Sequence, residues 1–224
     1  MKFEDTSVYN IYNAILGARN PKNSWNKSDS IFKGYNGKIE NTVIGKNDLK
    51  LLQSLIKAGS EHRKFMRQIG VSVIITAPLY WWKEFDTYKV GTVSNSCSTM
   101  HKLADTPITI DCFEMDDFED LNTEQGLESL KEIQWSSLIN WLEDLRRTYN
   151  ETKDKRYWKE LIRLLPESWL QKRTITMNYE NILNMYNQRC VHLHKLTEWS
   201  ITFKAWVESL PYAKELLCIP LVKK

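Results

Sequence analysis

The chain has 224 residues, with 31 basic and 28 acidic side chains, a formal charge of +3 and 42% hydrophobic residues. The even charge balance excludes a polybasic nucleic-acid-binding arm, and the apolar content excludes a disordered chain. The length suffices for one large domain or two small ones with a buried core. The longest apolar run, over residues 71–82, is too short to span a bilayer, which takes about 20 residues.

The N-terminal residues show no apolar core of a secretion signal. No Cys-x-x-Cys pair typical of a zinc site occurs, because the four cysteines are far apart: Cys97, Cys112, Cys190 and Cys218. We therefore expect a reduced, cytoplasmic protein without a metal, a membrane partner or a specific nucleic-acid partner.

The first predicted element is a helix. It begins at Asp5 or Thr6, which are typical N-caps, carries apolar residues at helical spacing and ends at Gly17. Residues 18–46 are polar and predict a long connection, of a kind that is usually functional or mobile.

A second helix is predicted over residues 47–59. The β-branched run over residues 70–78, bounded by Gly and Pro, predicts a strand. Residues 80–90 are predicted as helix or loop, residues 91–101 as a short polar segment, and the acidic run over residues 111–119 as solvated surface.

The second half of the chain is predicted to be mainly helical. Apolar periodicity predicts a long helix over residues 124–145, a shorter one over residues 157–164 that the next proline ends, and a last long helix over residues 182–210. Residues 174–177 predict a short strand. These elements together predict a single α+β domain over residues 1–224.

Polar side chains gather after the predicted strand, where a phosphate would find cations and short neutral donors. The preceding Trp81 and Trp82 offer a flat wall for a nucleobase. The segment therefore predicts a nucleotide site, and a Ser- and Asn-rich turn with surface lysines is the alternative. The candidate ligand-binding residues are Lys89, Thr92, Asn95, Ser96 and Ser98.

Two residues of the predicted last helix, if it begins at Asn178, are further candidates. Asn178 and Arg189 would lie on nearly the same face, roughly 16 Å apart along the axis. Arg189 interrupts an apolar stripe, so it must form an ion pair or face a ligand. For Asn178 a helix N-cap is the alternative. His192 and His194 would point apart on a helix, so they do not predict a metal site.

In this order the residues resemble the flavin-dependent thymidylate synthase family, also called the thymidylate-synthase-complementing proteins. The likeness spans roughly residues 50–210. The segments that carry it are Glu61-His62, Ala77-Pro78, residues 83–89 at the family's Arg-Gln-aromatic step and Arg-His-Arg motif, residues 94–98 at its Ser-x-Asn-Glu-x-Ser motif, and Asn178, Asn184 and Arg189.

The resemblance implies a central sheet with long helices, and homotetramers with active sites between subunits. It implies methylation of deoxyuridine monophosphate from methylene-tetrahydrofolate, with FAD carrying hydride from NADPH. Arg189 would be the catalytic residue that holds the uracil carbonyl edge. His62, Asn178 and Asn184 would face the flavin. The residues implied near the nucleotide phosphate are Lys89, Ser96 and Ser98.

The sequence also departs from the family pattern. Arg-His-Arg reads Thr87-Tyr88-Lys89, and the family's later Arg-Tyr falls on residues 99–101. Glu180 stands where the family has a cofactor-facing arginine, and a carboxylate repels a pyrophosphate. These changes argue against FAD binding in the family's usual manner, whereas Lys89 and Arg189 retain nucleotide recognition.

Three functions stay open at this point. The first is a divergent enzyme of one-carbon transfer that acts on dUMP or a related pyrimidine deoxynucleotide. The second is a non-catalytic nucleotide-binding protein that keeps the fold without flavin chemistry. The third is a structural protein with a vestigial site.

Overall fold

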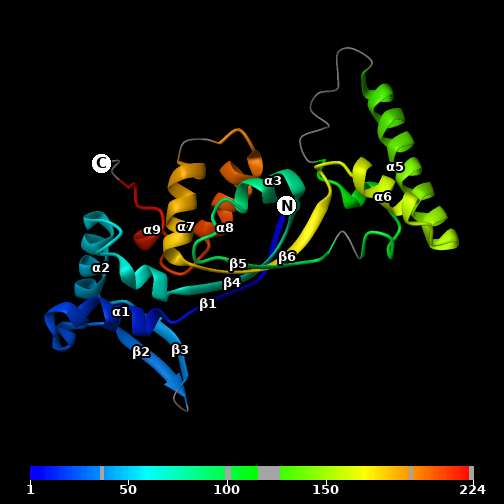
Figure 1. The fold of residues 1–224 in the computed structure, drawn as a ribbon. Coiled ribbons are helices and arrows are strands. Elements are labelled where there is room, and N and C mark those ends of the chain that lie inside the picture. Colours follow the sequence, from blue (N-terminus) through cyan, green and yellow to red (C-terminus); the bar gives the residue numbers. More distant parts are fainter. Residues whose placement is uncertain (36–37, 99–101, 116–126, 192–193, 222–224) are drawn as a thin grey trace. The chain divides into compact units, whose positions relative to one another are not determined.

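The structure is a computed structural model that describes residues 1–35, 38–98, 102–115, 127–191 and 194–221. Figure 1 follows the elements in chain order. The strands are β1 (Lys2–Tyr9), β2 (Ile31–Tyr35), β3 (Lys38–Val43), β4 (Gly70–Pro78), β5 (Val93–Ser96) and β6 (Leu170–Asn178). The α-helices are α1 (Ile11–Arg19), α2 (Lys46–Ala58), α3 (Leu79–Phe85), α5 (Leu127–Thr152), α6 (Lys155–Leu164), α7 (Tyr179–Met185), α8 (Lys204–Glu208) and α9 (Ala213–Leu216). Short 3₁₀ turns are η1 (Asn20–Lys22), η2 (Trp25–Lys27), η3 (Lys64–Gln68) and η4 (Ile110–Cys112), and π-helical segments are η6 (Tyr186–Cys190) and η7 (Glu198–Phe203).

The central sheet has four strands in the order β1-β4-β6-β5. Its strands run antiparallel to their neighbours. Just after β1, Asn10 Nδ2 donates to the carbonyl of Gln68, just before β4, at 2.8 Å. Just after β4, the N–H of Leu79 donates to the carbonyl of Trp169, just before β6, at 3.1 Å. Together with the helices this sheet makes an α+β fold, as the sequence predicts.

Strand β4 is the core strand of the sheet and confirms the prediction over residues 70–78. Its β-branched and small residues Val71, Val73, Ile75 and Ala77 are fully buried. β-Branched side chains suit a packed sheet surface, which explains why this run forms a strand although its length would also allow a helix turn.

The chain divides into two compact units, each with its own core. The prediction of one domain over residues 1–224 stays a prediction. The first unit comprises Met1–Lys2, Ile75–Thr87 and Asn95–Arg173, and the second unit comprises Phe3–Ile74, Tyr88–Ser94 and Thr174–Lys224.

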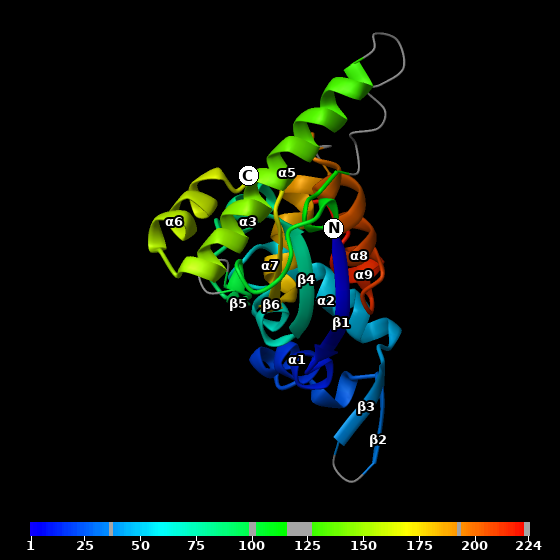
Figure 2. The same ribbon diagram turned by 90° about the vertical axis from the view of Figure 1, so that its right-hand side faces the viewer.

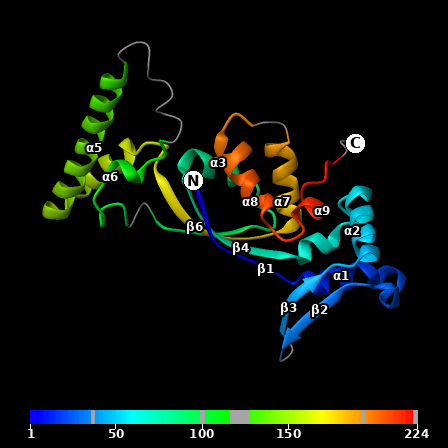
Figure 3. The same ribbon diagram turned by 180° about the vertical axis from the view of Figure 1, so that it is seen from behind.

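The core of the first unit lies between α5 and α6, which pack side by side (Figure 3). Leu142 and Leu145 of α5 and Leu161 of α6 are buried together with Phe113. The predicted helices over residues 124–145 and 157–164 are thus confirmed, and α5 continues to Thr152. Residues 124–126 lie outside the described residues.

The core of the second unit gathers α7, α8 and α9 (Figure 2). Tyr179 and Ile182 of α7 are fully buried, as are Trp199, Phe203 and Val207. Helix α2 confirms the prediction over residues 47–59. No helix among the described residues is both long enough and apolar enough to cross a membrane.

The predicted N-terminal helix is wrong in its first half. Residues 2–9 form β1, and the helix begins only after Asn10, whose φ is 69°. Thr6 caps no helix, because its hydroxyl accepts a hydrogen bond from Trp206 Nε1 at 3.0 Å. Gly17 does not end α1, which continues to Arg19 because that side chain is buried against Asp48.

Residues 18–46 are more ordered than the predicted connection. They hold η1, η2 and the antiparallel pair β2–β3, which Figure 1 shows beside α1. The polar composition concealed this hairpin because a two-stranded ribbon need not bury an apolar face.

The predicted long helix over residues 182–210 is also wrong. Helix α7 passes into the π-helical turn η6 and ends at Cys190, residues 194–196 are not helical, and η7 then leads into α8. Strand β6 confirms the predicted strand over residues 174–177 and extends it to Leu170–Asn178.

Candidate functional site

The guanidinium of Arg189 lies beside two aromatic rings of the second unit, whose centres are 6.4 Å apart. Its Nε donates to the Tyr88 hydroxyl at 3.0 Å, and its Nη1 lies 3.1 Å from His194 Nε2. The guanidinium carbon is 5.8 Å from the centre of the Tyr88 ring and 5.5 Å from that of Trp199. Cation–π attraction adds to the hydrogen bonds at such distances. The half-buried cation is therefore fixed in place.

The π-helical turn η6 decides where this guanidinium lies. The N–H of Val191 donates to the carbonyl of Tyr186 and that of His194 to the carbonyl of Arg189, each at 3.2 Å and each five residues back. A π-turn inserts an extra residue, so the side chains after it rotate away from α-helical phase. Isolated π-turns are common at functional sites.

The segment from Tyr88 to Thr92 is bound to α7 and η6. The Tyr88 hydroxyl donates to Gln188 Oε1 at 3.0 Å while it accepts from Arg189. Asn181 Nδ2 donates to the carbonyl of Val90 at 2.7 Å. Arg189 and the segment that contains Lys89 thus lie next to each other in the second unit.

Gly91 lies close to the side chains of Asn178 and Asn181 at the start of α7. Its φ is +80°, a left-handed conformation that glycine adopts without strain. A Cβ at this position would lie 3.0 Å from Asn178 Nδ2 and 3.1 Å from Asn181 Oδ1. The close packing of the segment on α7 therefore depends on a glycine here.

Asn178 is the N-cap of α7. Its Oδ1 accepts from the N–H of Asn181 at 3.0 Å, and Asn181 Oδ1 accepts from the N–H of Asn178 at 3.2 Å. This reciprocal pair is a capping box. The alternative prediction, that Asn178 is a helix N-cap, is confirmed. Its side-chain oxygen Oδ1 accepts the hydrogen bond from the N–H of Asn181.

Glu180 is buried and binds two arginines of the segment before β4. Its Oε1 lies 2.9 Å from Arg63 Nε, and its Oε2 lies 2.5 Å from Arg67 Nε. Arg63 also donates through Nη2 to Asn184 Oδ1 at 3.3 Å. The predicted flavin-facing Asn184 thus shares a charged cluster with Glu180, and the exposed His62 is next to Arg63 in the chain.

The remaining predicted ligand-binding residues are in two places. Lys89 is exposed and Thr92 half-buried on the second unit, where Thr92 Oγ1 donates to the carbonyl of Tyr88. Asn95 and Ser96 are exposed and Ser98 is half-buried, all on the first unit.

Several expectations lie outside the described residues. These are the family's later Arg-Tyr at residues 99–101, the acidic residues 116–119 and His192. Within the described part of the acidic run, Asp111 is exposed, and Glu114 is half-buried and bound to the N-terminal amine at 2.9 Å.

No protein-family model matches the sequence, and no curated protein matches it either. Solved structures do match. One is Thymidylate Synthase X (ThyX) from Helicobacter pylori with FAD and dUMP, at a TM-score of 0.66 and 18% identity, covering 97% of this chain and 97% of that one. Another is the flavin-dependent thymidylate synthase ThyX of the same organism complexed with FAD and dUMP, at a TM-score of 0.66 and 19% identity, covering 99% and 100%.

The fold is that of ThyX. The predicted thymidylate-synthase-complementing-protein-like architecture, a central sheet with long helices, is therefore confirmed over essentially the whole chain.

Sequence reasoning missed the residues that hold Arg189 and Glu180. The sequence marks Tyr88 only as a departure from the family's Arg-His-Arg motif. It marks His194 only as one of two histidines whose spacing does not suit a metal site. Arg63 and Arg67 carried no periodic signal. One signal for Arg63 was available in the sequence, because this residue directly follows Glu61-His62. A buried carboxylate such as that of Glu180 needs a cation close by, and Arg63 supplies it.

Proposed function

We propose that this protein binds a pyrimidine deoxynucleotide through Arg189 and the segment Tyr88–Thr92. We further propose that it acts as a divergent flavin-dependent thymidylate synthase-like protein, which transfers a one-carbon group to dUMP or a related nucleotide. The observation that carries the proposal is the guanidinium of Arg189, which is hydrogen-bonded to Tyr88 and lies beside the rings of Tyr88 and Trp199. The fold supports it, because the matching ThyX structures contain dUMP.

The proposed role of Arg189 follows from its chemistry. A guanidinium stays charged at every physiological pH and presents planar N–H donors, so it suits a carbonyl edge of a pyrimidine. Held beside two rings, it needs little reorganisation to stabilise negative charge that develops on the base. Lys89, exposed on the same segment, would supply a cation for the phosphate.

FAD does not fit the described residues in the family's manner. The carboxylate of Glu180 stands at the position where the family pattern has a cation, and it is bound to Arg63 and Arg67. The carbonyl oxygens of Asn178 and Asn184 are also engaged, by the helix cap and by Arg63.

The Glu180 cluster favours a second candidate function. A nucleotide-binding protein that has lost flavin chemistry would keep Arg189 and need no cation at position 180. Both candidates require the nucleotide, and only the first requires turnover.

The first experiment measures ligand binding. We expect dUMP to raise the melting temperature of the wild type, because a ligand that binds only the native state stabilises it. Arg189→Ala should abolish this shift and Arg189→Lys should reduce it, since a lysine lacks the planar fork. Arg156→Ala, whose side chain is 90% exposed, is the matched control and should keep the shift. An unchanged shift in Arg189→Ala would refute the proposed site.

The second experiment separates the two candidate functions. The protein is incubated with dUMP, methylene-tetrahydrofolate, FAD and NADPH, and the methylated nucleotide is measured by chromatography. Turnover that Arg189→Ala abolishes supports the enzyme. A dUMP-dependent shift in melting temperature without turnover and without a flavin absorption band supports the nucleotide-binding protein.

A further inference from the structure

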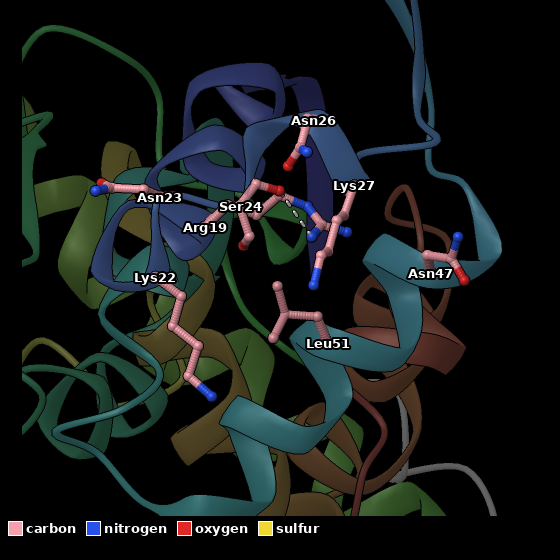
Figure 4. A pocket seen from close by; sticks show the side chains of 8 residues that line it. All are labelled: Arg19, Lys22, Asn23, Ser24, Asn26, Lys27, Asn47 and Leu51. Atoms are coloured by element: carbon pink, nitrogen blue, oxygen red, sulfur yellow. Dashed lines mark hydrogen bonds between the residues drawn. The ribbon is translucent and has the colours of Figure 1, made fainter.

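An open pocket in the second unit lies far along the chain from the residues proposed above. It has a volume of about 890 Å³ and is lined by residues of α1, η1, η2 and α2 and of the segment between η1 and η2 (Figure 4). Most of its lining residues belong to the first part of residues 18–46, the polar region that the sequence predicts to be a long connection. The proposed function gives this pocket no role.

The lining is cationic and polar. Arg19, Lys22 and Lys27 are joined by three asparagines and one serine, and Leu51 is the one apolar residue among the eight described residues that line it. None of those eight carries a carboxylate. With the described residues, neither Lys22 nor Lys27 forms an ion pair, and both are exposed. An apolar ligand would gain little here, whereas an anion meets cations and neutral N–H donors.

The wall of the pocket is pre-formed by a buried hydrogen-bond network. Arg19 is 5% exposed, and its Nε lies 2.5 Å from Asp48 Oδ1. Its Nη1 donates to the carbonyl of Ser24 at 3.2 Å, the bond drawn in Figure 4. Among the described residues Arg19 Nη2 has no acceptor, although the residue lines the pocket. A ligand oxygen would fill that position.

Asp48 neutralises the charge of Arg19, so the net positive charge of the lining comes from Lys22 and Lys27. Its second oxygen accepts from the hydroxyls of Ser28 at 2.6 Å and Ser30 at 2.5 Å and from the N–H of Ser30 at 3.1 Å. Burial alone would raise the pKa of Asp48, but the hydrogen bonds from Ser28, Ser30 and Arg19 outweigh it and hold that pKa below its usual range. The carboxylate is thus ionised and directed into the wall.

We infer that this pocket binds an oligophosphate group through Lys22, Lys27 and Arg19. The three cations come from separate positions of η1, η2 and the end of α1, so a ligand that contacts all of them must be extended. The volume lies in the range of sites for nucleotide-sized ligands and exceeds what one phosphate fills. The inference does not depend on the proposed function at Arg189.

The test uses sodium tripolyphosphate as the probe and the full chain at low ionic strength. We expect it to raise the melting temperature by roughly 5 °C at a hundredfold excess over its Kd. The double variant Lys22→Gln/Lys27→Gln should weaken binding, measured by calorimetry, at least about tenfold. The control Lys57→Gln/Lys214→Gln removes two exposed lysines that do not line the pocket and should bind as the wild type does.

Further variants keep the result decisive. Lys22→Arg/Lys27→Arg preserves both charges and should retain binding, and Arg189→Ala should retain it too. Adenosine triphosphate is measured alongside, and tighter binding than tripolyphosphate assigns a nucleotide while equal binding assigns a free oligophosphate. Absence of binding, equal weakening by both glutamine double variants, or loss of binding in Arg189→Ala would overturn the inference.

Discussion

Tyr88 and Arg189 are 101 positions apart in the chain and share a hydrogen bond of 3.0 Å between the tyrosine hydroxyl and Nε. The same hydroxyl donates to Gln188 Oε1 at 3.0 Å, so both of its hydrogen-bonding functions are directed at η6. Tyr88 thus sets the orientation of the guanidinium of Arg189.

The variant Tyr88→Phe tests this relationship. It keeps the ring beside Arg189 but removes the hydroxyl, so the guanidinium loses one fixed partner. A hydrogen bond to a charged group contributes about 1.5 kcal/mol, so dUMP affinity should fall about tenfold. Calorimetric titration measures it, with Tyr157→Phe on α6 as the control. Unchanged or tighter dUMP binding would show that Tyr88 does not position Arg189 for the ligand.

Gly91→Ala tests whether the packing of the Tyr88–Thr92 segment on α7 matters for binding. The new Cβ would meet Asn178 and Asn181 at 3.0–3.1 Å, at a φ of +80°. We expect a loss of about 1–2 kcal/mol of stability together with weaker dUMP binding. Gly59→Ala is the matched control, because Gly59 also has a positive φ, of 127°, but lies outside this segment. It should lose stability and keep dUMP affinity.

Much of the fold could be predicted from local sequence. Strand β4 and helix α2 follow from β-branched composition and from apolar periodicity bounded by glycines. β1 could not be predicted, because a polar edge strand is defined by its pairing with β4 and not by its own pattern. The interruption after Cys190 was equally hidden, since a π-turn depends on side-chain contacts that only the folded chain supplies.

Sequence selects candidate site residues only where a residue's own chemistry is unusual. Arg189 is a candidate because a charge interrupts an apolar stripe, and Asn178 because it would lie on nearly the same helix face, with an N-cap as the alternative that the structure bears out. The partners that give these residues their geometry, Tyr88 and His194, are ordinary in sequence and meet Arg189 only through tertiary structure. The pairing of Glu180 with Arg63 spans 117 positions, which no local spacing reveals.

Because of Glu143 on α5, the first unit loses stability when the pH falls into the acid range. Hydrogen bonds from Arg146, at 2.6 and 2.7 Å, lower the pKa of Glu143 to about 2, and the N–H of Ile108 contributes a further bond. A carboxyl whose folded pKa is lowered stabilises the fold above its unfolded pKa, and this stabilisation is lost as the pH falls through the folded pKa. The affected range therefore runs from about pH 4.5 down to about pH 2.

Glu143→Gln should lower the melting temperature by roughly 5 °C at pH 7, as expected for a loss of about 2 kcal/mol. The difference from the wild type should shrink as the pH falls below about 4.5, where the wild-type carboxyl begins to be protonated in the unfolded chain. Melting curves at several pH values measure it. A difference that stays constant down to pH 2 would assign the effect to packing rather than to the charge.

The carboxylate of Glu180 is the feature that decides between the two candidate functions, because it opposes the binding of an anionic flavin cofactor. Glu180→Gln leaves the guanidinium of Arg63, which is 11% exposed, without a charged partner, so we expect a loss of about 3 kcal/mol in urea unfolding. Arg67→Gln is the control: this side chain is 49% exposed, and its removal keeps the Arg63–Glu180 pair, so the loss should stay below about 1 kcal/mol.

The same Glu180→Gln variant makes this cluster more positive by one charge, because Arg63 and Arg67 both remain. If the carboxylate of Glu180 is what opposes an anionic cofactor, FAD affinity must rise in Glu180→Gln relative to the wild type, and it must rise less in Glu180→Gln/Arg67→Gln. Flavin fluorescence quenching at matched ionic strength measures both. Equal or weaker FAD binding in Glu180→Gln would place the obstacle to flavin binding elsewhere, and the case for a nucleotide-binding protein would then no longer rest on Glu180.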